Sequence, residues 1–149
     1  NKKYFKETEN FYGTIFFSSK KKFIDIGMFD ENYFFYWEDV DLAKRIIESG
    51  QKIIISRKAT AKHLGGKSSI AGIKNLFIRE VNFKFGEYLF YHKNNKLRKF
   101  KIIRQFFNTI IYSIFYLLIF DKTNFLKKFF QVIGIIKFII FISVYVKKN

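Results

Sequence analysis

Two long apolar runs in the C-terminal part most constrain how this chain can fold. Residues 105–120 (QFFNTIIYSIFYLLIF) carry no charge, and residues 129–146 (FFQVIGIIKFIIFISVYV) are interrupted only by Lys137. Each run falls short of, or barely reaches, the roughly 20 residues that a membrane-spanning helix needs. We therefore expect a helical hairpin that lies in, or dips into, a membrane interface. Two alternatives stay open: a transmembrane pair, with Lys137 snorkelling or facing its partner helix, and core helices of a larger soluble domain.

Basic residues border both apolar runs. The 149-residue chain has 28 basic and 12 acidic residues, a formal net charge of +16, which favours attraction to membrane phospholipid, nucleic acid or diphosphate-linked substrates. No nucleic-acid-binding signature is present, and uncharged runs of this length suit no groove of a nucleic acid. An anionic membrane surface is thus the expected partner, and nucleic acid is not. The bordering residues are Lys99, Lys101, Arg104, Lys122, Lys127, Lys128, Lys147 and Lys148.

Three carboxylates occupy four positions between an aromatic stretch (33–37) and a helical pattern. The three are Glu38, Asp39 and Asp41, and the apolar helical positions are Leu42, Ala43, Ile46 and Ile47. In one interpretation Asp39 is the helix N-cap and Asp41 is a first-turn acid that pairs with Arg45. In the other, Tyr36 and Trp37 form a sugar-sized wall beside a functional carboxylate. Asp39 and Asp41 do not read as a metal pair, because helical side chains two residues apart project to roughly opposite sides.

A histidine and a glycine-rich loop follow this helix. Gly50 is expected to end the helix, residues 52–56 to form a short buried strand, and residues 59–62 to form an extended segment that leads to His63. A single histidine is either a hydrogen-bonded structural residue or a ligand. The loop that follows, Gly65, Gly66, Lys67, Ser68 and Ser69, is basic but lacks the P-loop spacing for phosphate binding.

The other segments have simpler patterns. Residues 14–17 read as a strand and residues 23–28 as a short helix. Residues 75–92 predict an amphipathic connecting helix whose apolar positions are Phe77, Val81, Phe85 and Leu89. The polar, basic segment 93–101 is the strongest candidate for a boundary. The chain contains no cysteine, which excludes disulfides and cysteine metal sites.

Several motifs together resemble a known enzyme family. In order they are GTIFF (13–17), IGMFDE (26–31), YWEDVDL (36–42), Arg45, Gly50 and HLGGKS (63–68). This combination is similar to family 2 glycosyltransferases, particularly the rhamnosyltransferase-like bacterial branch, and covers roughly the first half of the chain. The resemblance implies a GT-A fold, an α/β sandwich, and a hexosyl transfer that inverts the anomeric centre of a nucleotide-sugar donor.

The resemblance also implies roles for individual residues. Asp39 would be the general base. Beside it, our own interpretation of the side chains adds Glu38 as a supporting acid and Trp37 and Tyr36 as acceptor-side walls. His63 would complete the coordination of a divalent metal, Mg²⁺ or Mn²⁺, held against the donor diphosphate. The donor-side loop would contain Gly65, Gly66 and Ser68.

We therefore expect an α/β fold, the C-terminal part of a GT-A domain, followed by a mainly α-helical apolar tail. Residues 1–74 would be the acceptor-side catalytic half, 75–100 the connecting helix and basic linker, and 101–149 a membrane-associating hairpin. The residues before Gly13 are too few to represent the nucleotide-binding half of the family, and the chain begins with Asn1. We therefore expect the 149 residues alone to turn over substrate slowly or not at all.

The predicted enzyme extends a lipid-linked glycan or polysaccharide at the cytoplasmic face of the bacterial inner membrane. Competing interpretations are a noncatalytic membrane-anchored interaction module and a basic nucleic-acid-binding protein.

Overall fold

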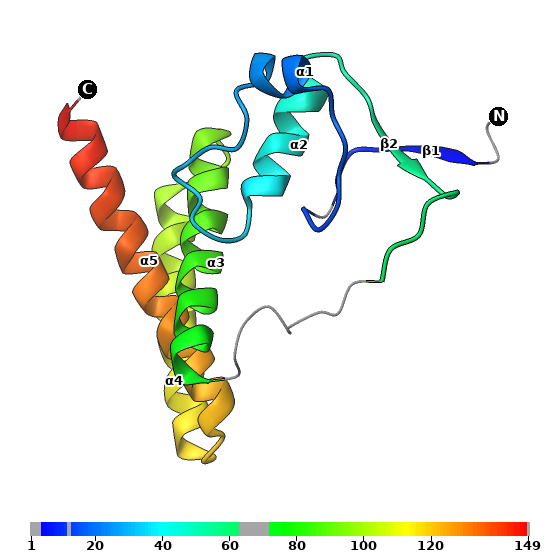
Figure 1. The fold of residues 1–149 in the computed structure, drawn as a ribbon. Coiled ribbons are helices and arrows are strands. Elements are labelled where there is room, and N and C mark those ends of the chain that lie inside the picture. Colours follow the sequence, from blue (N-terminus) through cyan, green and yellow to red (C-terminus); the bar gives the residue numbers. More distant parts are fainter. Residues whose placement is uncertain (1–3, 12, 63–71, 149) are drawn as a thin grey trace. The chain divides into compact units, whose positions relative to one another are not determined.

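The computed structural model describes residues 4–11, 13–62 and 72–148 (Figure 1). The chain forms two compact units, Asn1–Ser69 and Ile70–Asn149. In the described residues, the first unit combines short helices with a small sheet, and the second contains helices alone. The unit boundary thus precedes the predicted connecting helix, and the basic segment 93–101 lies inside the second unit.

The sheet of the first unit pairs strands from its two ends. β1 (Phe5–Thr8) and β2 (Ile53–Ser56) are antiparallel, with Phe5 opposite Ser56 and Thr8 opposite Ile53. The strand predicted at 52–56 is therefore confirmed in position, but its predicted burial is wrong. Ile54 and Ile55 are 59% and 46% exposed in this two-stranded sheet.

The strand predicted at 14–17 is not formed, and a phenylalanine of this segment instead joins a cluster of aromatic rings. That segment forms turns and irregular structure, and the Phe16 ring contacts the rings of Phe23 and Phe29 at centroid distances of 5.8 and 5.7 Å. Helix α1 (Lys20–Asp25) begins earlier than the predicted 23–28, because the Ser19 side chain caps it by accepting the Lys22 N–H. Residues 59–62 belong to no strand.

Helix α2 (Glu38–Glu48) follows the predicted pattern closely. Leu42 and Ala43 are fully buried, whereas Ile47 at the end of the same face is 38% exposed. Gly50 ends the helix as predicted, with a left-handed φ of 78°. Its N–H donates to the Ile47 carbonyl and the Gln51 N–H to the Ile46 carbonyl, the bond pattern of a Schellman motif.

The second unit consists of α3 (Ile73–Lys93), α4 (Lys99–Leu118) and α5 (Lys122–Lys148), with α5 packed against both others. The predicted helix at 75–92 is confirmed, and Val81, Phe85 and Leu89 of its apolar stripe are buried. It packs against α5 and is therefore part of this helical unit. At that contact a Cβ on Gly134 would lie only 2.6 Å from the Val81 carbonyl oxygen, so glycine allows the close approach.

Helices α4 and α5 form the predicted hairpin, but the apolar tail is not supported. Within the described ranges, no helix combines the length and the apolar character that crossing a membrane requires. Of the expected α/β fold, the described residues contain helices and one two-stranded sheet, and the GT-A fold itself stays a prediction.

Candidate functional site

The backbone takes an unusual path just before the three carboxylates. Tyr36 and Trp37 are consecutive non-glycine residues with left-handed φ angles of 67° and 74°. Such conformations cost on the order of 1–3 kcal/mol each and are concentrated at functional sites. Trp37 occupies the N-cap position of α2 without a side-chain capping hydrogen bond. This turn therefore places Glu38 and Asp39 in the first turn of the helix.

Asp39 does not cap the helix, which corrects one of the two sequence interpretations. It lies inside the first turn, and its Oδ2 accepts the backbone N–H of Gly13 at 2.9 Å. Its Oδ1 accepts the N–H of Val40 at 2.8 Å. A Cβ on Gly13 would lie 3.4 Å from the Asp39 Cβ, so the two segments are in close contact. The start of the GTIFF motif thus meets the Glu-Asp pair across 26 positions of sequence.

Glu38, the neighbouring acid, is half-buried. Burial raises the pKa of its carboxyl, and the charge of Asp39 raises it further, while a hydrogen bond with its own backbone opposes them. Its Oε2 is buried and has no hydrogen-bond partner among the described residues. The pair therefore combines a carboxylate anchored by N–H groups with a carboxyl that holds its proton more tightly than usual, an arrangement typical of functional sites.

Asp41 has the structural role that the sequence suggested. It is only 3% exposed, and the Arg45 Nε donates to its Oδ2 at 2.8 Å, which confirms the predicted pair. The Tyr33 hydroxyl also donates to Asp41, at 3.4 Å. Burial, and then the charge of Asp41, raise the pKa of the Tyr33 phenol well above its usual value.

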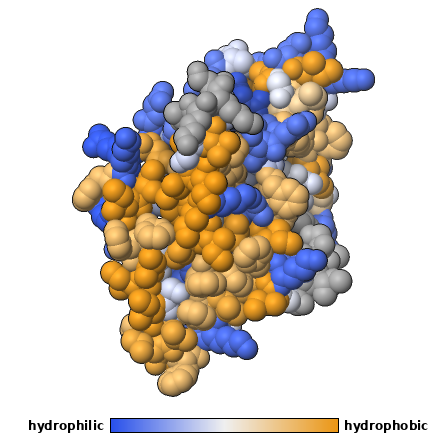
Figure 2. Space-filling view, turned by 90° about the vertical axis from the view of Figure 1, so that its left-hand side faces the viewer, coloured by the Kyte–Doolittle hydropathy of each residue, from blue (hydrophilic) through white to orange (hydrophobic). Residues whose placement is uncertain are grey.

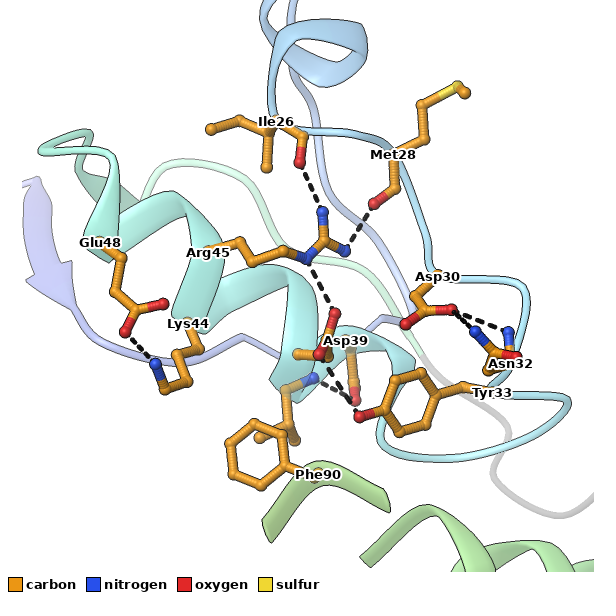
Figure 3. A network of polar contacts seen from close by, with 12 residues as sticks. Ile26, Met28, Asp30, Asn32, Tyr33, Asp39, Lys44, Arg45, Glu48 and Phe90 are labelled. Carbon is orange, nitrogen blue, oxygen red and sulfur yellow. Dashed lines mark hydrogen bonds and ion pairs between the residues drawn. The ribbon is translucent and has the colours of Figure 1, made fainter. Parts of the chain in front are cut away.

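Arg45 also connects α2 to the loop that follows α1. Its two terminal nitrogens donate to the carbonyl oxygens of Ile26 and Met28, at 2.6 and 2.7 Å, and Figure 3 shows the guanidinium between them. Met28 itself has a left-handed φ of 54°. One side chain therefore holds the IGMFDE motif against the helix that carries Asp39 and Asp41.

These contacts were only partly visible in the sequence. The Asp41–Arg45 pair is local, one helical turn apart, and was predicted. The sequence did not predict the hydrogen bond from the Gly13 N–H to Asp39. It also did not predict those from Arg45 to the carbonyls of Ile26 and Met28. The only hint of these contacts in the sequence was that Gly13, Ile26 and Met28 belong to motifs that precede Asp39 in the order typical of the family it resembles.

The donor and metal side of the predicted site lies outside the described residues. This applies to His63, Gly65, Gly66 and Ser68. Among the residues that are described, no group of three or more His, Asp or Glu side chains could hold a metal ion. Asp39 and Asp41 bind different partners, so their D-x-D spacing does not gather two carboxylates for one ion. Mg²⁺ or Mn²⁺ at this site stays a prediction.

A comparison with protein families covers the segment that contains these residues. Residues 1–66 match a family model described as the N-terminal domain of galactosyltransferase. Comparisons with curated proteins and with solved structures found no match. The matched range includes both motif segments that meet at Asp39. It supports a glycosyltransferase domain, and hence in general a nucleotide-sugar donor and a glycan acceptor, while the rhamnosyltransferase-like branch of family 2 is not confirmed.

Proposed function

We propose that the first unit is the acceptor-side part of an inverting glycosyltransferase. The enzyme transfers a hexosyl group from a nucleotide-sugar to a hydroxyl of a lipid-linked glycan or polysaccharide. The family match supports glycosyl transfer in general. The observation that carries the finer proposal is the Asp39 carboxylate, anchored by the Gly13 N–H at 2.9 Å.

Asp39 acts as the general base. It takes the proton of the acceptor hydroxyl as the oxygen attacks the anomeric carbon. The bond from that carbon to the diphosphate oxygen breaks on the opposite side, and its electron pair leaves with the nucleoside diphosphate. Each carboxylate oxygen has two lone pairs, so hydrogen bonds from Gly13 and Val40 fix the group while a lone pair stays available for the proton.

The neighbouring residues support this transfer. Tyr36 and Trp37 provide aromatic surface for an acceptor sugar, and their strained turn holds them next to Asp39. Glu38, whose pKa burial raises, is suited to donate a hydrogen bond to an acceptor oxygen beside the base. The donor side would consist of a loop with Gly65, Gly66 and Ser68 and a divalent metal bound by His63, which would neutralise charge on the diphosphate.

The test compares Asp39→Asn with the exposed control Asp25→Asn. Membranes from cells that express the complete gene are incubated with labelled nucleotide-sugars, and transfer to lipid and glycan acceptors is measured. We expect Asp39→Asn to lower the rate by about 10²- to 10⁴-fold, because the positioned base is lost, with the control near wild type.

Two results would overturn the proposal. One is an Asp39→Asn variant that transfers sugar as fast as Asp25→Asn. The other is a product whose anomeric configuration, measured by NMR, is that of the donor.

A further inference from the structure

Helix α4 has its polarity reversed relative to a helix of a water-exposed bundle. Its buried residues are Thr109 and Ser113, which are 8% and 6% exposed. Most of its large apolar residues lie outward, with Phe107 at 57%, Ile111 at 61% and Leu118 at 71% exposed. An amphipathic helix in water has the opposite arrangement. The outward surface of α4 therefore suits apolar surroundings.

The rest of the hairpin continues this surface. The exposed apolar residues of α5 include Phe129, Ile136, Ile139, Ile140 and Val144. Figure 2 shows hydrophobic residues gathered across the middle of one face, with hydrophilic residues mainly at its margins. We call the outward apolar residues of α4 and α5 together the hairpin face. Contiguous apolar surface of this kind marks interaction sites in proteins.

Polar contacts lie between the helices of this unit. The Tyr88 hydroxyl donates to Gln105 at 2.6 Å and thereby joins α3 to α4. The Lys137 ammonium donates to Asn82 at 2.8 Å and joins α5 to α3, near the close contact at Gly134. Small residues and hydrogen bonds between helices, with large apolar residues outside, are the pattern of helices packed in lipid.

The charge of the unit indicates which apolar partner it has. Residues 70–149 contain 15 basic and three acidic residues. Arg104, near the start of α4, and Lys122, just beyond its end, are both exposed. Exposed apolar residues between them, including Phe107 and Leu118, are therefore flanked by positive charge at both ends. A second copy of the chain would bring like charges together. An anionic bilayer instead offers acyl chains to the apolar residues and phosphates to the basic residues beside them.

We propose that the hairpin face docks on a phospholipid bilayer that contains anionic lipid. Phe107, Ile111 and Leu118 insert among the acyl chains, and Arg104 and Lys122 bind headgroup phosphates. Amphipathic elements with basic margins bind membrane interfaces in this way. The docking rests on the second unit alone and does not depend on sugar transfer, so either proposal can fail without the other.

The first experiment measures flotation of the full chain with phosphatidylcholine vesicles, with and without phosphatidylglycerol. The variant Phe107→Ser/Ile111→Ser/Leu118→Ser is compared with Phe17→Ser/Ile24→Ser/Ile54→Ser, three exposed apolar residues of the first unit. We expect binding to anionic vesicles that falls at least about tenfold in the hairpin variant and stays near wild type in the control. Circular dichroism checks that both variants keep their helices.

A second measurement uses the absence of cysteine from the chain. Ile111→Cys and Phe17→Cys are each labelled with an environment-sensitive dye. We expect anionic vesicles to shift the emission of the dye at 111 to the blue and to leave the dye at 17 unchanged, because only position 111 enters the apolar layer. Because the dye is attached to single-cysteine variants, this measurement tests the docking even if the triple serine variant folds poorly.

Three outcomes would overturn the docking proposal. The hairpin variant could float as well as wild type, or the dye at 111 could fail to respond. Alternatively, sedimentation without lipid could show a dimer that the hairpin variant abolishes while no form of the chain binds vesicles, in which case a second copy covers this face.

Discussion

The two units of this chain use polar and apolar residues in opposite ways. In the first unit a buried carboxylate, Asp41, and a half-buried arginine, Arg45, hold loops and helix together, and basic and acidic residues number 13 and nine. In the second, α4 buries Thr109 and Ser113 and exposes most of its large apolar residues, and basic and acidic residues number 15 and three. The first arrangement fixes individual polar groups, which suits the sugar transfer proposed for this unit. The second exposes an apolar surface, which suits the membrane docking proposed for that unit.

The strongest test of this contrast removes the central side chain of the first unit. Arg45→Met leaves Asp41 buried without its ion pair and frees the carbonyls of Ile26 and Met28. We expect the free energy of unfolding to fall by roughly 3 kcal/mol. Urea unfolding followed by the fluorescence of Trp37, the single tryptophan, reports on this unit.

The exposed Arg57 provides the matched control for that experiment. Arg57→Met removes the same charge from the same unit and should change the unfolding free energy little. Equal effects of the two substitutions would show that Arg45 acts through net charge alone, and the positioning role assigned to it would be wrong.

A smaller effect is expected in the second unit, where helix packing dominates. Gly134→Ala places a Cβ 2.6 Å from the Val81 carbonyl oxygen and 2.9 Å from the Lys84 Cβ. Alanine favours helices over glycine by about 1 kcal/mol, but the helices must separate to admit it. We expect a net loss of about 1 kcal/mol, measured by thermal unfolding of the helical signal.

Gly72→Ala serves as the control, because a Cβ there meets no atom within 4 Å. If Gly134→Ala stabilises the chain, the close contact between α3 and α5 is not a constraint on this unit.

The smallest effect concerns the pH dependence of the first unit. Burial raises the pKa of Glu38 in the folded chain, so its favourable contribution is present below the ordinary glutamate pKa and is lost as pH rises through the raised value. Glu38→Gln removes this loss. We therefore expect the variant to gain stability relative to wild type between about pH 4 and about pH 7.

Urea unfolding at both pH values measures that gain, with the exposed Glu31→Gln as control. A difference between Glu38→Gln and wild type that does not change with pH would contradict the proposed burial of this carboxyl.

The sequence predicted features whose causes are local. The helix with Leu42 and Ala43 buried, its end at Gly50 and the Asp41–Arg45 pair all arise within a few residues, and each is confirmed. The helices α3, α4 and α5 were predictable because their patterns are long.

Features set by distant residues were missed or wrong. Asp39 was a candidate N-cap, but its carboxylate instead accepts an N–H from Gly13, 26 positions away. The strand predicted at 14–17 fails because Phe16 packs on Phe23 and Phe29. The inward position of Thr109 and Ser113 could not be predicted either, because the sequence of a largely apolar helix does not show which of its sides meets the neighbouring helices.

The central claim is that Asp39 removes the acceptor proton, and chemical rescue tests it most directly. In membranes with the complete gene product, Asp39→Ala should lose transfer by about 10²-fold or more, and added formate should restore part of the rate by replacing the missing carboxylate. The same formate should not improve Asp41→Ala, whose defect is structural. Sugar transfer by Asp39→Ala at the wild-type rate would contradict the account.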